Sequence, residues 1–183
     1  MKILAVMCSF VLGFSLASCG SGSNGPDADA APSASPTPTA TLPAKPKGKV
    51  EPTAESAAQF ISYWIDVQNY AFATGDYELL ESISHPDCEG CNVLLDAIFE
   101  IYEEGGYLQN NQWSLNEFIA KPHDGGIQVT GTIQASKGEL FYAGETTPTE
   151  LKAMSAQGTF LLHVYGRGWM MTEFSADTKG SKD

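Results

Sequence analysis

Two cysteines three residues apart, in the segment HPDCEGC at residues 85–91, constrain the fold of this chain more than any other feature. The segment stands between two stretches with helical periodicity, which places Cys88 and Cys91 on the first turn of a helix. At that spacing their Cα atoms lie about 5 Å apart, within the range that a disulfide accepts. The spacing therefore predicts a bridge that fixes the start of this helix. The alternatives are a thiol-exchange site, or a zinc site with His85 as a third ligand.

The N-terminal segment indicates the cellular compartment in which the cysteines lie. Met1 and Lys2 are followed by an apolar run at residues 3–16, which is too short to span a bilayer and has the form of a signal peptide. Residues 16–19 (LASC) resemble a bacterial lipobox, in which the cysteine is lipidated and the chain is cut before it. We therefore expect a signal peptide at residues 1–18 and a lipid, including palmitate, on Cys19. An ordinary secretory signal with an incidental cysteine is the alternative.

This location favours the disulfide over the other two readings of the cysteine pair. Cys8 lies in the signal peptide and Cys19 would carry lipid, so Cys88 and Cys91 are left to pair in an oxidising compartment. Thiol-exchange proteins of the thioredoxin type place their motif directly after a strand, whereas here a helix precedes it. A zinc site would lack a clear fourth ligand. We expect no cofactor and no metal.

Residues 19–51 have the composition of a tether. After the lipidated cysteine they contain six prolines, one leucine and no aromatic residue, so they cannot bury enough apolar area to offset the cost of ordering the backbone. We expect a disordered linker that joins the membrane to a domain at residues 52–176, followed by a polar tail at 177–183. Without the signal peptide, 9 basic side chains stand against 22 acidic ones, which argues against nucleic acid as a partner.

The domain begins with three segments of helical periodicity. The first lies between Thr53, a suitable N-cap, and Gly75, a suitable left-handed C-cap. The second covers residues 77–83 and the third residues 88–104. The first helix carries an apolar stripe, and its opposite side, which we expect to face water, carries three polar residues: Ser62, Asp66 and Asn69.

Strand patterns follow the helices. Residues 127–136 alternate apolar and polar side chains, with Gly131 marking a bulge or bend, and residues 159–165 form a second alternating stretch. We expect further strands at 113–120, 140–143 and 169–174. Three helices before a curved antiparallel sheet predict an α+β fold.

Three short motifs carry a resemblance to a known family. They are YAFATGD at residues 70–76, PDCEGC at 86–91 and GW at 168–169. With them, residues 52–176 resemble the nuclear transport factor 2-like (cystatin-like) cone and, more narrowly, are similar to actinobacterial lipoproteins whose domain has no assigned function. The resemblance implies three N-terminal helices packed on a curved antiparallel sheet. It also implies a cone mouth, which holds a small ligand in many relatives and an Asp or His acid/base in the enzymatic ones.

Tyr63, Tyr70 and His163 form the candidate ligand pocket. His163 stands beside the two tyrosines if its face of the strand lines the cone, and otherwise it is a hydrogen-bonded histidine on the outer face. No acid/base maps onto the first helix, so we expect no catalytic residue. These features predict a non-enzymatic lipoprotein at the extracytoplasmic face of the cell membrane, which binds a small apolar ligand or an envelope protein. The alternatives are a cone-type isomerase or lyase, and a thiol-disulfide redox protein.

Overall fold

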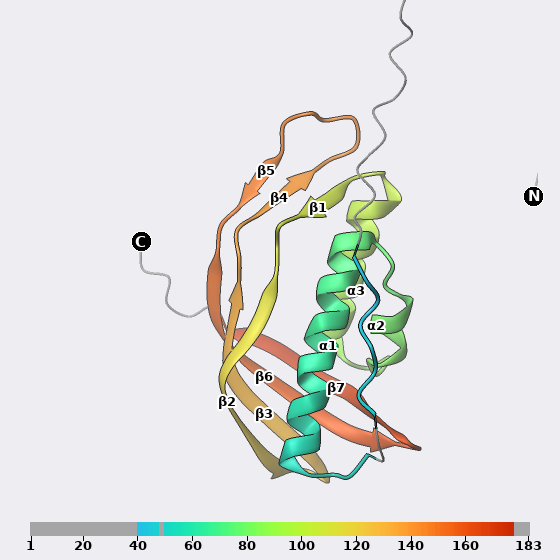
Figure 1. Ribbon diagram of the computed structural model, residues 1–183, viewed down its shortest axis with the longest axis vertical. Helices are drawn as coiled ribbons and strands as arrows, with labels where there is room; N and C mark the ends of the chain where they lie inside the picture. The colour runs from blue at the N-terminus through green and yellow to red at the C-terminus, as the bar shows by residue number, and fades with distance from the viewer. Residues whose placement is uncertain (1–39, 48–49, 178–183) are drawn as a thin grey trace, which may run out of the picture. The chain divides into compact units, whose positions relative to one another are not determined.

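The computed structural model describes residues 40–47 and 50–177 and has an α+β architecture in which the helices precede the strands (Figure 1). The helices are α1 (Ala54–Thr74), α2 (Glu78–Ser82) and α3 (Glu89–Glu103). The strands are β1 (Tyr107–Gln109), β2 (Trp113–His123), β3 (Gly126–Ala135), β4 (Gly138–Phe141), β5 (Thr149–Leu151), β6 (Met154–Tyr165) and β7 (Gly168–Asp177).

The strands form two antiparallel sheets. One has the order β2-β3-β6-β7 and the other the order β1-β4-β5 (Figure 1). The prediction of one curved antiparallel sheet, as in a nuclear transport factor 2-like cone, is therefore wrong. The predicted strand at 140–143 corresponds to β4, and it belongs to the second sheet.

The two sheets are separated where the chain leaves the strand conformation at two neighbouring places, between β1 and β2 and between β3 and β4. Asn110, which follows β1, has a left-handed φ of 60°, and residues 136–137 lie outside both β3 and β4. The Ser136 hydroxyl donates to the Asn110 carbonyl oxygen at 2.6 Å and accepts from the Gln112 amide at 2.8 Å. These side-chain bonds satisfy backbone groups that a continuous ladder would otherwise pair.

Helix α1 has the caps that the sequence predicts. The Thr53 hydroxyl accepts from the Ser56 amide at 3.2 Å, and Gly75 takes a φ of 79° at the C-cap. A side chain at position 75 would also meet the Tyr102 ring, since an ideal Cβ would lie 2.6 Å from it. Glycine is thus required at this position for both conformation and space.

The core lies between α1 and the four-stranded sheet. Trp64 is fully buried there, with its ring centroid 6.4 Å from that of Phe160 and 5.6 Å from that of Phe174. Its indole Nε1 donates to the Ser84 hydroxyl at 3.1 Å, which in turn donates to the Leu80 carbonyl at 2.8 Å. Aromatic packing with one satisfied polar group therefore anchors the helices to the sheet.

Asn69 differs from its prediction. Instead of facing water, its side-chain amide donates to the Trp113 carbonyl at 2.9 Å and its oxygen accepts from the Trp113 amide at 2.8 Å. The side chain thus pairs with the first residue of β2 as a neighbouring strand would. Ser62 and Asp66 are exposed, as predicted. Periodicity assigns a face of the helix, but it does not show that β2 begins beside that face.

Candidate functional site

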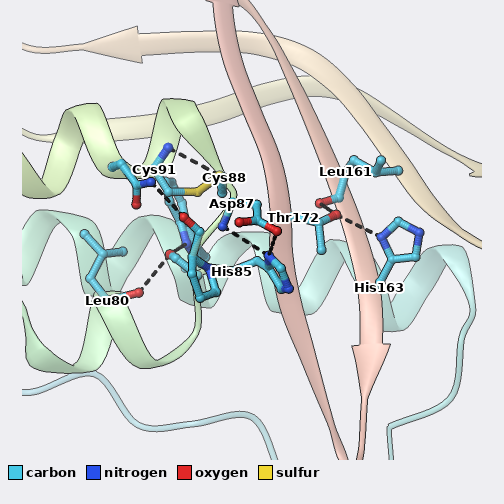
Figure 2. Close-up of a disulfide and its surroundings, with 12 residues drawn as sticks. Leu80, His85, Asp87, Cys88, Cys91, Leu161, His163 and Thr172 are labelled. Atoms are coloured by element: carbon cyan, nitrogen blue, oxygen red, sulfur yellow. Dashed lines mark hydrogen bonds and ion pairs between the residues drawn. A yellow bond between two sulfur atoms is a disulfide. The ribbon is translucent and has the colours of Figure 1, made fainter.

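The cysteine pair lies at the start of α3 and is buried. Cys88 and Cys91 are joined in a disulfide with a Cα–Cα distance of 5.2 Å, and Cys88 is the N-cap residue of α3 (Figure 2). The Cys91 amide donates to the Cys88 sulfur at 3.3 Å, so the sulfur satisfies one free donor of the first turn. The bridge is thus part of the helix cap.

The residues around the disulfide hold α3 against the edge of the large sheet. The His85 amide donates to the Met171 carbonyl at 2.7 Å, and the Met171 amide donates to the Ile83 carbonyl at 3.0 Å. Between the cysteines, a side chain on Gly90 would overlap the Phe174 carbonyl oxygen on β7. This close approach explains a glycine in the first turn of a helix, where it is otherwise unfavourable.

His85, the third ligand in the zinc alternative, makes protein contacts instead. Its ring centroid is 5.3 Å from that of Tyr165, and its Nδ1 is 3.7 Å from an Asp87 carboxylate oxygen. Within residues 40–47 and 50–177, no three His, Cys, Asp or Glu side chains gather as metal ligands. Both cysteine sulfurs are bonded to each other in the disulfide, so they do not act as metal ligands beside His85. The contacts of His85 are with Tyr165 and Asp87.

We expect native, unreduced protein to be labelled by iodoacetamide at neither Cys88 nor Cys91, because both sulfurs are bonded and buried. Mass spectrometry of proteolytic peptides measures the label. After unfolding and reduction, both residues should be labelled, which is the control. Labelling of either residue without reductant would show that the bridge is absent.

The three residues of the predicted pocket do not share one cavity in the described part of the chain. Tyr63 is 4% exposed, and burial raises its pKa. Tyr70 donates to an Asp76 carboxylate oxygen at 3.0 Å, and this hydrogen bond and then burial raise its pKa. The two tyrosines line separate cavities on α1, and both cavities are also lined by residues 40–47.

His163 lies apart from the tyrosines, on β6. Its Nδ1 is 2.8 Å from the Thr172 hydroxyl, and its Nε2 is 3.0 Å from the Asp124 carbonyl oxygen. In Figure 2 it stands beyond Thr172, away from the disulfide. These bonds match the alternative of a hydrogen-bonded histidine that ties the β2–β3 turn to the sheet.

Residues 40–47 (ATLPAKPK) form a strap along α1, although the sequence predicts them to be part of a disordered linker. Figure 1 shows the strap running beside α1 in the opposite direction. One cavity, of about 50 Å³, lies between its C-terminal half and the start of α1, and another, of about 350 Å³, lies between its N-terminal half and the end of α1.

The two strap cavities have different side chains on the domain side. The smaller one has three aromatic residues, Phe60, Tyr63 and Trp169, beside Val50, Ser56 and Gln59, and the Trp169 indole donates to the Ser56 hydroxyl at 2.8 Å. The larger one has Asp66, Asn69, Tyr70, Ala73 and Gln112. Tyr63 and Tyr70 are both predicted site residues, whereas the strap has no sequence signal of its own, because Pro43 and Pro46 follow other closely spaced prolines at 32, 36 and 38.

Two further hollows in the described residues contain no predicted site residue. One, of about 700 Å³, lies beside β4 and β5 and is lined by Lys137, Glu139, Glu150 and Lys152. The other, of about 520 Å³, lies between the end of α3 and β4, with Glu100, Glu103 and Glu104 at its rim. No helix within the described ranges has both the length and the apolar character needed to cross a bilayer.

Comparison with solved structures finds similar proteins whose sequences are only 12–16% identical to this one. The intermembrane-space region of the chloroplast protein ARC6 is similar, with a TM-score of 0.53, 16% identity and alignment over 69% of this chain and 98% of that chain. Proteins described as calcium/calmodulin-dependent protein kinase II association domains align with lower scores. The one from Thiobacillus denitrificans has a TM-score of 0.39, 16% identity and coverage of 73% and 100%. The one from Xanthomonas campestris has a TM-score of 0.42, 12% identity and coverage of 74% and 96%.

At 16% identity, the likeness to the ARC6 region concerns the fold alone. No curated protein sequence matches the chain significantly. A family model does match, over residues 28–175, and it covers most of the predicted linker, the strap, and the two-sheet domain up to two residues before the end of β7. The chain belongs to a family of unknown function, DUF6318.

Proposed function

We propose that this protein is a non-enzymatic binding module, tethered through a lipid on Cys19 to the extracytoplasmic face of the cell membrane. The observation that carries the binding role is the pair of cavities along α1, lined by Tyr63 and Tyr70 and bordered by the strap. The resemblance of residues 16–19 to a lipobox supports the tether.

The chemistry of the two tyrosines suits binding. A tyrosine of ordinary pKa, about 10, is already protonated at neutral pH. Burial raises the pKa of Tyr63 further, and the hydrogen bond to Asp76 is the first cause that raises the pKa of Tyr70, so both phenols stay neutral over a wider pH range. A neutral phenol offers an aromatic face and a hydroxyl, which together recognise partners of mixed polarity. The two phenols therefore supply both apolar and hydrogen-bonding groups to the proposed binding site.

The tether is tested by feeding alkyne-tagged palmitate to a bacterium that lipidates proteins and makes this chain. We expect label on the native chain and none on the Cys19→Ser variant, because the thiol is the lipid acceptor. Ser18→Ala keeps a small residue before the cysteine and should be labelled as the native chain is. Label on the Cys19→Ser variant would contradict the lipid anchor.

The binding role is tested by native mass spectrometry of residues 20–183, which lack the signal peptide and Cys19, with and without envelope lipid extract, together with crosslinking of the native chain in cells. We expect either a bound small molecule or one specific crosslinked protein. A bare mass in both conditions, with no crosslinked partner, would contradict the proposal.

A further inference from the structure

We infer that the open edge of the three-stranded sheet, at β5, is an interface for a second copy of this chain. The two copies pair their β5 strands antiparallel, so that the order β1-β4-β5 in one copy continues as β5-β4-β1 in the other. The inference goes beyond the proposed binding function, because β5 lies outside both cavities along α1.

In the described part of the chain, three of the four sheet edges carry a feature that hinders pairing with another chain. β7 is covered by residues 83–85, whose backbone bonds to the amide and carbonyl of Met171. β2 is interrupted by a bulge and contains Pro122, which has no amide hydrogen to donate. On β1, the Leu108 amide donates to the Tyr102 hydroxyl at 3.5 Å. Such features keep edge strands from pairing with other chains.

The edge at β5 has no such cover within residues 40–47 and 50–177. β5 pairs with β4 alone, at the margin of the sheet in Figure 1, and β7 pairs with β6 only from Gln157 onward. No loop or side chain of the described residues bonds to the other side of β5, where Thr149, Glu150 and Lys152 are exposed. An uncovered edge offers its backbone N–H and C=O groups to another strand.

The charges along this edge select one register for two copies. When Leu151 lies opposite the second copy's Leu151, each Glu150 lies opposite a Lys152. Opposite charges on facing residues of an antiparallel pair are favourable, whereas like charges are unfavourable. Moving the centre of the pairing by one residue would place Glu150 opposite Glu150, or Lys152 opposite Lys152. The strand is therefore self-complementary about Leu151, as an interface with two-fold symmetry requires.

The second copy also supplies a charge that β5 lacks within its own sheet. Glu150 lies directly opposite Glu139 on β4, where two like charges are unfavourable. Neither carboxylate forms an ion pair within the described residues. Both glutamates line the hollow of about 700 Å³ beside β4 and β5, which leaves space for a further side chain. The second copy's Lys152, opposite Glu150, offsets this repulsion.

The length of the edge makes the association reversible. Pro148 precedes β5 and cannot donate a backbone hydrogen bond, so the ladder between the copies is limited to residues 149–153 of each. So short a ladder buries less surface than the interface of a permanent dimer. The copies therefore associate where their local concentration is high, as it is for chains tethered side by side on one membrane.

Cysteine crosslinking of residues 20–183 tests the register. Facing Cα atoms of an antiparallel pair lie about 4.5–5.5 Å apart, within the range of a disulfide. At a chain concentration of about 1 mM, similar to the effective concentration that a short tether supplies, we expect Leu151→Cys to form a covalent dimer as its main product under mild oxidation. Thr149→Cys is the control on the same strand. Its two thiols would lie about 13 Å apart along the strands, so its dimer yield should be at least about fivefold lower.

Exchange of the charges tests what selects the register. In the Leu151→Cys chain, adding Glu150→Lys or Lys152→Glu should lower the dimer yield about fivefold or more, because like charges then face each other. Mixing the two variants should restore the yield, since every facing pair then joins a lysine to a glutamate. Lys121→Glu, an equal change of charge at an exposed position on β2, should leave the yield unchanged. Sedimentation equilibrium of the charge variants, alone and mixed, gives the same comparison without the added cysteine.

Three results would each overturn the inference. They are an absence of covalent dimer from a Leu151→Cys chain whose circular dichroism is native, equal yields from Leu151→Cys and Thr149→Cys, and no recovery of the dimer when the two charge variants are mixed. The assays use neither lipid nor a ligand at the cavities along α1. Failure of the proposed tether or of the proposed binding role would therefore leave their outcome unchanged.

Discussion

Replacing Trp64 by Ala should lower the free energy of unfolding by about 3–5 kcal/mol, the range for truncating a large core aromatic residue. Trp64 is fully buried, contacts Phe160 and Phe174, and donates to Ser84, which lies 20 residues later in the chain. The variant thus loses packing between α1 and the large sheet and a link to the segment before α3. Urea unfolding followed by far-UV circular dichroism gives the value.

Trp64→Phe is the matched control for this substitution. It keeps an aromatic ring and removes the indole donor, and the Ser84 hydroxyl still donates to Leu80. We therefore expect Phe to retain more stability than Ala. A loss below about 1 kcal/mol for Trp64→Ala would show that the interface between α1 and the sheet is looser than described, since most exposed sites give changes of that size or less.

Replacing Gly90 by Ala should destabilise the protein by about 1–3 kcal/mol, the cost of overpacking a close contact. In an unconstrained helix the same change would stabilise by up to about 1 kcal/mol, so the sign of the effect is itself informative. The added methyl group would overlap the Phe174 carbonyl oxygen. Because the methyl group would meet a backbone atom, which cannot rotate away as a side chain can, α3 must move away from β7, and the disulfide limits how its first turn can adjust.

Thermal and urea unfolding of Gly90→Ala measure this effect, with Val93→Ala on the exposed side of the same helix as the control. Val93 is 67% exposed, so its truncation should change stability by less than about 0.5 kcal/mol. A Gly90→Ala variant that is more stable than the native chain would contradict the close approach of α3 to β7.

Local sequence signals predicted the helical half of the fold well. Thr53 and Gly75 mark the ends of α1 because a cap is a short-range property of the backbone. The alternation of apolar and polar residues predicted β3 and β6, but it could not show that the strands divide into two sheets. That division depends on Asn110 and Ser136, which are 26 residues apart and meet only in the folded chain.

The candidate pocket residues are separated in the structure. Tyr63 and Tyr70 line two different cavities on the strap side of α1. The strap was missed because its composition, rich in proline and lysine, is typical of a linker, and composition does not show what a segment packs against. His163 was grouped with the tyrosines because alternation gives the face of a strand without its neighbours, which are Thr172 and Asp124.

NMR relaxation of the backbone ¹⁵N nuclei measures whether residues 40–47 are held against α1. In a chain of residues 20–183, the amides of Thr41, Ala44, Lys45 and Lys47 should have order parameters near 0.8, close to the value of about 0.85 for rigid backbone. The Pro43→Gly, Pro46→Gly variant should show lower values at the same amides. Order parameters below about 0.6 in the strap-intact chain would mean a flexible linker and would contradict the account.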